Sequence, residues 1–287
     1  MASKSYRFCR KFAGATLCLF FAIIACFGLF LLQTQSGSKD ESWLKGSDKR
    51  TVIRVRKTTD LQSVQQYDPV VHPDAIIGHA EWLKLADALL PDIIDPGIGS
   101  HVALLLAAAV LTEGAMVEFG SGYHSTPMLH KLILRRGPPY RRLLTADSDK
   151  EWLDKFSATL NTSFHQFQLV SGRTREEQTA EWARLLDGCS NFEYGVIFVD
   201  QYPEQSRSPS LTRLANCTKL AVTHDTEFKG GGYNYWSAIK AYRYKFESAH
   251  FGVGVMVLSN YSQHLLNQVQ QLLWWFLEAR RLGSKNS

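Results

Sequence analysis

The chain has 287 residues, of which 45% are hydrophobic and 21% charged, which is ordinary usage for a globular protein able to bury a large core. The formal net charge is only +5, and lysine and arginine form no dominant run, so the composition argues against a nucleic-acid-binding protein. The small basic cluster at 54–57 is interpreted as a solvated edge.

The first element along the chain is an uncharged stretch, AGATLCLFFAIIACFGLFLL, at residues 13–32. An apolar helix of about 20 residues spans a bilayer. The basic residues that precede it are Lys4, Arg7, Arg10 and Lys11. By the positive-inside rule, residues 1–12 are then a cytosolic tail and the stretch is a signal anchor. We expect a single-pass type II membrane protein facing the lumen of the Golgi or the endoplasmic reticulum. A cleaved signal peptide is the alternative.

Residues 33–70 are polar and predict a stem or linker before a domain at 71–287. Two features of that domain bear on the topology. It carries the glycosylation sequons Asn161-Thr-Ser, Asn216-Cys-Thr and Asn260-Tyr-Ser. Its two cysteines, Cys189 and Cys217, suggest one disulfide in an oxidising compartment, with two separate buried thiols as the alternative.

Strand-like and helix-like segments alternate through most of the domain. Helices are predicted at 76–90 and 100–111, and the second is so apolar that it should be buried. Strands follow at 116–119, 142–146, 166–170, 194–199, 220–223 and 252–259, with helices at 126–134, 150–160, 175–186, 209–215, 235–244 and 263–281. The alternation predicts an α/β fold: a Rossmann-like, mostly parallel sheet with helices on both faces, preceded by the N-terminal transmembrane helix.

Two aromatic-rich segments each leave two interpretations open. The C-terminal helix at 263–281 is amphipathic, and Trp274 and Trp275 widen its apolar face. It either packs on the sheet or rests on the lumenal membrane surface. The segment 228–236 combines three glycines with aromatic residues, which is typical of a lid over a site or of aromatic core at a helix start.

Residues that carry chemistry gather where the predicted strands end. In an open parallel sheet, ligands bind outside these carboxyl ends. The residues concerned are Glu118, Gly120 and Gly122 at the first strand, Asp147 at the second, Asp200 after the fourth, and His224 and Asp225 at the fifth. Acids scattered over a surface would not favour those positions, so the clustering predicts an active site.

The stretch around Gly120 and Gly122 is a candidate ligand-binding loop. Glycines allow the backbone to approach a ligand closely, and the helix after Ser125 would point its N–H groups at it. A plain strand-to-helix turn is the alternative. Asp147 should end the adjacent strand, where an acid can bind both ribose hydroxyls of a nucleotide. Asp149 is interpreted as a helix N-cap.

VEFGSG at 117–122 and TADSDKEWL at 145–153 together resemble class I S-adenosylmethionine-dependent methyltransferases. In that family an acid-x-Gly-x-Gly-x-Gly loop is followed by an acidic end of the second strand. The resemblance covers about residues 116–260 and implies that S-adenosylmethionine is the cofactor, with Glu118 near its methionine end and Asp147 on its ribose. Two departures are His124 in place of the third glycine and a third strand without the common acid near the adenine.

YGVIFVDQYPEQ at 194–205 and KLAVTHDTE at 219–227 also resemble that family. Asp200 occupies the fourth-strand acid position, and His224-Asp225 stands where metal-dependent O-methyltransferases carry two ligands. A weaker similarity is to the Golgi-anchored enzymes that methylate glucuronoxylan. It implies a hydroxyl-bearing acceptor such as a carbohydrate.

A hydroxyl group is a poor nucleophile, so its methylation needs a base or a cation that helps to remove the proton. His224 is the expected base, oriented by Asp200 or Asp225. Alternatively, Asp200 and Asp225 hold a divalent cation such as magnesium or manganese. We therefore expect a membrane-anchored methyltransferase. A nucleotide-sugar or dinucleotide-binding enzyme is one alternative. A non-catalytic lumenal interaction protein with a decayed donor site, which His124 favours, is the other.

Overall fold

The computed structural model describes residues 77–136, 141–227 and 232–283. Every described residue belongs to one compact unit, 68–287. The anchor predicted at 13–32 and the stem predicted at 33–70 lie outside the described residues. Within the described ranges, no helix combines the length and the apolar character that crossing a membrane requires.

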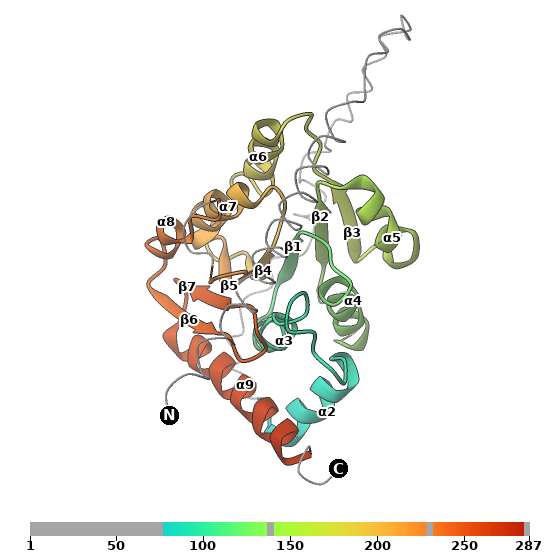
Figure 1. Cartoon of the computed structure of the whole chain (residues 1–287), viewed down its shortest axis with the longest axis vertical. Coiled ribbons are helices and arrows are strands. Elements are labelled where there is room, and N and C mark those ends of the chain that lie inside the picture. Colours follow the sequence, from blue (N-terminus) through green and yellow to red (C-terminus); the bar gives the residue numbers. More distant parts are fainter. Residues whose placement is uncertain (1–76, 137–140, 228–231, 284–287) are drawn as a thin grey trace, which may run out of the picture. The chain divides into compact units, whose positions relative to one another are not determined.

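A seven-stranded sheet forms the centre of the described domain, in the order β3-β2-β1-β4-β5-β7-β6 (Figure 1). The strands are β1 Ala115–Phe119, β2 Leu143–Asp147, β3 His165–Leu169, β4 Tyr194–Val199, β5 Thr218–His224, β6 Tyr244–Ser248 and β7 Val255–Ser259. β1 to β5 are parallel, whereas β7 runs antiparallel to both β5 and β6. The predicted α/β class with a mostly parallel sheet is confirmed.

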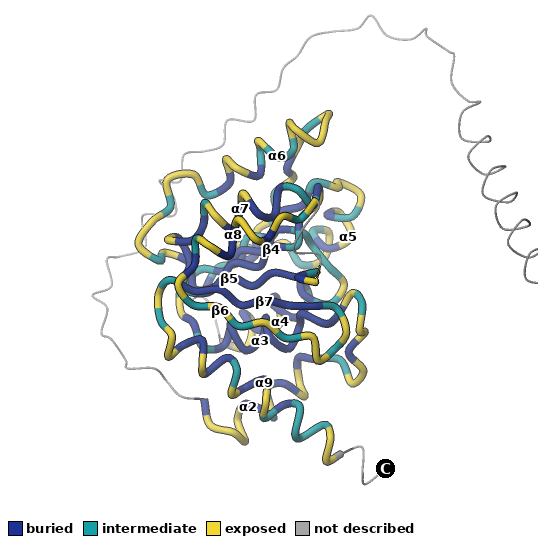
Figure 2. Tube along the Cα trace, turned by 60° about the vertical axis from the view of Figure 1, so that its left-hand side comes forward, coloured by how far each residue is buried: buried dark blue, intermediate teal, exposed yellow. Residues whose placement is uncertain are grey.

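Helices cover both faces of the sheet, as Figure 2 shows. One face carries α2 (His79–Leu89), α3 (Val102–Leu111), α4 (Ser125–Arg136) and α9 (Gln263–Gly283). The other carries α6 (Arg175–Arg184), α7 (Arg207–Arg213) and α8 (Tyr235–Ile239). Helix α5 (Lys150–Leu160) packs on β2 and β3.

The buried segments have the composition that their positions demand. Every residue of α3 from Val102 to Val110 is buried, as expected of a helix that is apolar all round. All of β4 is buried too, because helices cover both sides of a central parallel strand. Because α3 and β4 are both buried in the core, the carboxyl ends of β4 and its neighbouring strands have a fixed position.

Helix α9 confirms the packing interpretation of the C-terminal helix. Leu266, Val269, Leu273 and Phe276, which were expected to share one face, are all buried. Trp275 meets the His79 ring edge-on, which extends this face to α2. Trp274 is 56% exposed. Contact of that exposed side with a membrane stays a prediction.

The prediction of a single helix at 235–244 is wrong. Helix α8 ends at Ile239, and the chain then turns into β6. In β6, half-buried Tyr244 and Phe246 alternate with exposed Lys245 and Glu247. That period of two marks an edge strand with one face on the core.

The strand predicted at 252–259 begins later than expected. The backbone N–H of Val253 donates to the Pro96 carbonyl at 3.0 Å, and that of Gly254 donates to Glu227 Oε2 at 2.8 Å. Because these donors are used outside the sheet, strand pairing begins only at Val255.

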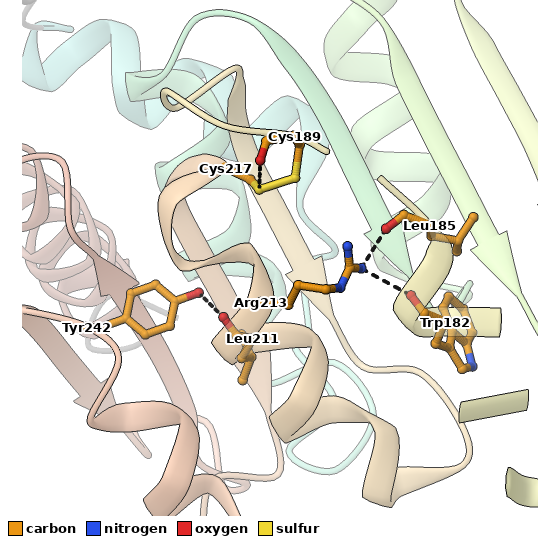
Figure 3. The surroundings of a disulfide bond; sticks show 7 residues. All are labelled: Trp182, Leu185, Cys189, Leu211, Arg213, Cys217 and Tyr242. Atoms are coloured by element: carbon orange, nitrogen blue, oxygen red, sulfur yellow. Dashed lines mark hydrogen bonds between the residues drawn. A yellow bond between two sulfur atoms is a disulfide. The ribbon is translucent and has the colours of Figure 1, made fainter. Parts of the chain in front are cut away.

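The predicted disulfide between Cys189 and Cys217 is confirmed, with Cα atoms 5.4 Å apart (Figure 3). It ties the loop after α6 to the start of β5. Arg213 supports the same region, since its guanidinium donates to the carbonyls of Trp182 and Leu185 at the end of α6. The bond lies away from the strand ends that carry the candidate site, and so its role is structural.

Candidate functional site

All the site residues predicted from the sequence lie at or next to the carboxyl ends of the parallel strands, and these ends form one edge of the sheet. β2, β1, β4 and β5 are consecutive neighbours, and their carboxyl ends meet there. Two backbone hydrogen bonds join the loops: Asp200 N–H donates to Phe119 O and Gly120 N–H donates to Ala146 O, both at 2.8 Å. The Ser148 hydroxyl adds a third link by donating to Tyr202 O at 2.8 Å.

The two glycines of the loop after β1 have different physical roles. Gly120 has a φ of +91°, and a Cβ there would lie 2.6 Å from the Asp200 carbonyl oxygen. The fold itself therefore requires glycine at 120. At Gly122, a Cβ would meet only the Ser125 hydroxyl oxygen, at 3.0 Å. The turn interpretation thus explains Gly120, and only Gly122 leaves room for a ligand.

Glu118 is completely buried in the middle of the sheet, beside Thr145 of β2 in register. Its Oε2 accepts hydrogen bonds from the hydroxyls of Thr145 at 2.7 Å and Thr126 at 2.9 Å. Its Oε1 makes no hydrogen bond of regular geometry. Burial raises the pKa of Glu118 to about 7, against the hydrogen bonds that favour the ionised form.

A chain of polar side chains that the sequence did not reveal continues behind Glu118. Thr145 Oγ1 lies 2.9 Å from His165 Nε2, and His165 Nδ1 lies 3.0 Å from His130 Nδ1. Because Thr145 donates to Glu118, its oxygen accepts from His165, and His165 Nδ1 in turn accepts from His130. Burial lowers the pKa of His165 to about 3, so this ring is neutral. The network fixes the orientation of Glu118.

Asp147 holds the loop after β1 in place. Its Oδ2 accepts from the backbone N–H of Ser121 at 2.7 Å and from the Ser121 hydroxyl at 2.6 Å. Its Oδ1 accepts from Asp149 N–H at 2.9 Å. A carboxylate has about four acceptor positions, so one remains for a ligand. Burial raises the pKa of Asp147, opposed by these hydrogen bonds.

Asp149 is the N-cap of α5, as predicted: its carboxylate accepts from Trp152 N–H at 2.9 Å. The Trp152 indole N–H donates to Ser121 O at 2.7 Å, and exposed Tyr123 stacks edge-on against the same ring at 4.7 Å. The loop around Ser121 is therefore held from both β2 and α5.

A second group of polar side chains consists of Asp200, His224 and Asp225 around Arg207. No role for Arg207 was predicted from the sequence. Its Nη1 lies 2.8 Å from Asp200 Oδ1 and 2.8 Å from Asp225 Oδ2. The guanidinium also donates to the Gln201 carbonyl at 2.9 Å. Burial lowers the pKa of Arg207, but Asp200, Tyr235 and Asp225 outweigh this and raise the pKa above its ordinary value. The side chain therefore stays charged. It holds the two carboxylates apart at a fixed spacing.

His224 lies between the same two carboxylates. Its Nδ1 is 3.4 Å from Asp200 Oδ2 and 3.5 Å from Asp225 Oδ1, and its Nε2 is 2.8 Å from the Ser100 hydroxyl. Burial lowers the pKa of His224, but Asp200 and Asp225 outweigh this and raise it. Asp225 has a φ of +59°, a left-handed conformation that aspartate tolerates and that turns its side chain toward the group.

Asp200 stays ionised although it is deeply placed. Burial would raise its pKa, but Arg207, His224 and His101 together lower the pKa below its usual value. The group therefore holds two carboxylates against one guanidinium and one titrating imidazole.

His101, at the start of α3, is a member of this group that the sequence missed. Its ring stacks on Phe198 at 4.7 Å and meets His224 edge-on at 4.8 Å. Neither ring nitrogen has a hydrogen-bond partner. Burial lowers the pKa of His101 to about 3, and the neighbouring His224 lowers it further. No motif marks His101, because it precedes β1 and reaches the site only through the packing of α3.

Of the two residues predicted to hold a metal, Asp200 belongs to a cluster of possible ligands and Asp225 does not. Among the described residues, one ligand atom each from His101, Asp200 and His224 lies within 4.8 Å of the others. Asp225 is the residue that the sequence paired with Asp200 for this purpose. Between these two carboxylates the structure places Arg207, which already supplies a positive charge.

The described part of the aromatic segment packs beneath this group. Tyr235 is buried, and its hydroxyl donates to the His224 carbonyl at 2.8 Å. The Tyr233 hydroxyl donates to Asp225 Oδ2 at 3.3 Å. Trp236 is exposed. Residues 228–231 lie outside the described ranges, and so closure by this segment stays a prediction.

A surface depression of about 660 Å³ lies elsewhere, between α7 and α8. Its lining includes Ser208, Thr212, Arg213 and Ser237. None of the residues at the strand ends borders it. The groups around Glu118 and around His224 therefore lie outside this depression.

A scan against models of known protein families finds no match, and neither does a search of curated proteins. A search of solved structures finds similar folds. One is a methyltransferase from Geobacter sulfurreducens, 14% identical over 65% of this chain and 98% of its own, with a TM-score of 0.39. Another is the O-methyltransferase TomG from Streptomyces achromogenes, solved in complex with S-adenosylmethionine, 14% identical over 63% and 88%, with a TM-score of 0.40.

A third similar structure is an O-methyltransferase from Bacillus cereus in complex with S-adenosylhomocysteine. It is 14% identical over 67% of this chain and 94% of its own, with a TM-score of 0.41. Similarities at these identities and TM-scores do not assign an activity. The activity is therefore inferred from this chain's own residues.

The two glycines should respond differently to substitution by alanine. Gly120→Ala places a Cβ against the backbone of Asp200 at a positive φ and should lower the free energy of unfolding by about 3 kcal/mol. Gly122→Ala meets only the end of a serine side chain and should cost less than about 1 kcal/mol. Urea denaturation of both variants measures this, and equal losses would show that the contact with Asp200 does not constrain the loop.

Glu118 should make stability depend on pH. Its pKa in the folded protein, about 7, lies above the ordinary 4.5, so the folded form keeps a proton that the unfolded form has released. Stability from this residue is therefore present below pH 4.5 and is lost as the pH rises toward 7, by on the order of 3 kcal/mol. Denaturation of wild type and Glu118→Gln across that range isolates the effect. Parallel pH profiles of the two proteins would contradict it.

Proposed function

We propose that the described domain is a class I S-adenosylmethionine-dependent methyltransferase that acts on a hydroxyl group. One observation carries this proposal: two different polar groups share one edge of the sheet. Glu118, Ser121 and Asp147 surround the loop after β1, with a buried carboxylate oxygen and an acceptor position left open. Beside them, Asp200, His224 and Asp225 form a separate group suited to proton removal.

The first group suits a donor that carries a ribose and a cationic end. The open acceptor position on Asp147 suits a ribose hydroxyl, because a charged acceptor strengthens that hydrogen bond. Glu118 Oε1, which has no partner, suits the ammonium of a methionine end. A bound ammonium would also offset the burial that raises the pKa of Glu118. Both positions are those implied by the resemblance of 117–122 and 145–153 to this family.

The second group suits a hydroxyl acceptor. In the tautomer that carries its proton on Nε2, His224 donates to the Ser100 hydroxyl, and Nδ1 is then the basic atom on the side of Asp200 and Asp225. His224 Nδ1 would take the hydroxyl proton, and a bound donor would supply the methyl group to the acceptor oxygen. The two carboxylates stabilise the imidazolium that results. Arg207 contacts both carboxylates and holds them in position.

The structure weakens the dinucleotide alternative. Dinucleotide-binding sheets of the Rossmann type have the strand order 3-2-1-4-5-6. Here the antiparallel β7 enters between β5 and β6. A decayed donor site is disfavoured because Glu118 and Asp147 keep open acceptor positions although His124 stands where the family has a glycine.

We also propose that the protein is a type II membrane protein of the Golgi or endoplasmic reticulum, and that its acceptor is a carbohydrate. The apolar stretch at 13–32 and the Cys189–Cys217 disulfide support a lumenal domain. The weaker resemblance to the glucuronoxylan enzymes supports a sugar. So do Tyr123 and Tyr202, exposed aromatic side chains in the loops at this edge, because aromatic faces stack on sugar rings.

The donor assignment predicts a specific binding profile. Isothermal titration of the full-length chain in detergent should show binding of S-adenosylmethionine and S-adenosylhomocysteine but not of NAD. Asp147→Asn should weaken that binding by about 10- to 150-fold, equivalent to the 1.5–3 kcal/mol of a hydrogen bond to a charged group. His224→Ala should bind the donor normally and lose turnover.

Asp149→Asn is the matched control for the donor experiment. It lies two residues from Asp147 and keeps its capping role, because asparagine is as good an N-cap as aspartate. Its donor affinity should equal that of wild type. Binding of NAD alone would favour the dinucleotide enzyme, and binding of none of the three ligands would favour the interaction protein.

The lumenal topology predicts glycosylation at an accessible sequon. Asn161 is exposed, so Asn161→Gln should remove one glycan, seen as a mobility shift that glycosidase treatment abolishes. Asn260 is the control, because its amide nitrogen donates to the carbonyls of Ala215 and Ala241 and is not free for modification. Asn260→Gln should leave the glycan count unchanged. A wild-type chain without any glycan, expressed in a glycosylating cell, would argue for the opposite topology.

A further inference from the structure

We infer that His101, Asp200 and His224 form a binding site for a divalent first-row transition-metal ion such as zinc, cobalt or manganese. The inference does not depend on methyl transfer, because it concerns only the three side chains and the ion. It shares Asp200 with the carboxylate pair expected from the sequence, but two histidines replace Asp225 and magnesium is no longer among the preferred ions.

The first observation is His101, whose imidazole is buried without a partner. Both ring nitrogens are inaccessible to solvent, and neither has a hydrogen bond. A buried polar atom in a folded protein nearly always has a partner, and a missing one calls for an explanation such as an ion. The stacking on Phe198 at 4.7 Å holds the ring beside His224.

The second observation is the spacing of the ligand atoms. A metal with bonds of 2.0–2.2 Å in tetrahedral geometry has ligand atoms about 3.4 Å apart. His224 Nδ1 and Asp200 Oδ2 are already 3.4 Å apart. All three ligand atoms lie within 4.8 Å of one another. The three residues come from the start of α3 and the ends of β4 and β5, which are rigid elements.

The third observation is that the neighbours already orient the ligands. Ser100 binds His224 Nε2 at 2.8 Å, which turns the lone pair of Nδ1 toward Asp200. Arg207 occupies Asp200 Oδ1, which leaves Oδ2 for another cation. Metal-ligating histidines and carboxylates almost always have such outer partners.

Arg207 also explains why Asp225 is not in the set. Its Nη1 lies 2.8 Å from Asp225 Oδ2 as well as from Asp200 Oδ1. A metal ion between these two carboxylates would have to displace a buried guanidinium.

The ligand types select the class of ion. Two imidazoles and one carboxylate suit zinc, cobalt or manganese, whereas magnesium and calcium prefer oxygen ligands alone. Three protein ligands leave at least one coordination position open for water or for a hydroxyl group. Such a site is compatible with the proposed acceptor chemistry.

The test measures metal binding directly on the full-length chain in detergent. After treatment with a chelator and dialysis against zinc, cobalt, manganese or magnesium, the metal content should approach one ion per chain for a transition metal and stay near zero for magnesium. Bound cobalt should show the visible absorption of a protein-coordinated ion. The melting temperature should rise with metal concentration, because the ion binds only the folded state.

His101→Phe is the decisive variant. Phenylalanine keeps the stacking on Phe198 and removes both nitrogens, so the protein should fold as before. Its metal affinity should fall by more than the about 10- to 100-fold that the loss of an outer partner costs. His250→Gln removes an exposed imidazole elsewhere and should bind metal as wild type does. Asp225→Asn should also retain the metal.

Two outcomes would overturn the inference. One is a wild-type chain that takes up no transition metal, and the other is a His101→Phe variant that binds as tightly as wild type. Titration of S-adenosylhomocysteine into the same metal-free protein separates this question from the proposed function. Donor binding without metal uptake would reject only the metal site, and metal uptake without donor binding would reject only the methyltransferase.

Discussion

The close contact between the backbones at Gly120 and Asp200 is the constraint on which the candidate site depends. No side chain fits at 120, because a Cβ would lie 2.6 Å from the Asp200 carbonyl oxygen. This contact brings the loop after β1 against the loop after β4, and the hydrogen bond from Asp200 N–H to Phe119 O fixes it. The group around Glu118 and the group around His224 therefore stand at one edge of the sheet rather than on separate surfaces.

Charge balance organises the second group. Arg207 lies 2.8 Å from a carboxylate oxygen of both Asp200 and Asp225, and it lowers the pKa of Asp200. His224 lies between the same carboxylates, either as an imidazolium or, on the inferred metal site, as a neutral ligand beside a dication. His101 is neutral, and its ring nitrogens have no hydrogen-bond partner, which is why we infer an ion beside them. The same residues thus serve as base or as ligand set, and direct metal measurement distinguishes the two states.

Local sequence patterns predicted the strands and the residues at their ends, because these features depend on residues close in the sequence. Strand alternation placed Glu118, Asp147, Asp200 and His224 at strand ends, and the parallel fold then brought them together. The Cys189–Cys217 bond followed from the placement of both cysteines just before neighbouring strands.

Residues that act across long sequence separations escaped prediction. His101 lies far before β4, and only the packing of the apolar α3 delivers it to the site. Arg207 is the first residue of α7 and belongs to no motif, and its ion pairs form only because β4 and β5 are adjacent. The strand β6 was hidden because its short period-two pattern directly follows a helical one.

A crystal structure of the protein with S-adenosylhomocysteine tests the central claim most directly. We expect the ribose within hydrogen-bonding distance of Asp147, the ammonium at Glu118, and the sulfur facing His224 and Asp200. A ligand bound in the depression between α7 and α8, or one whose sulfur points away from His224, would contradict the account.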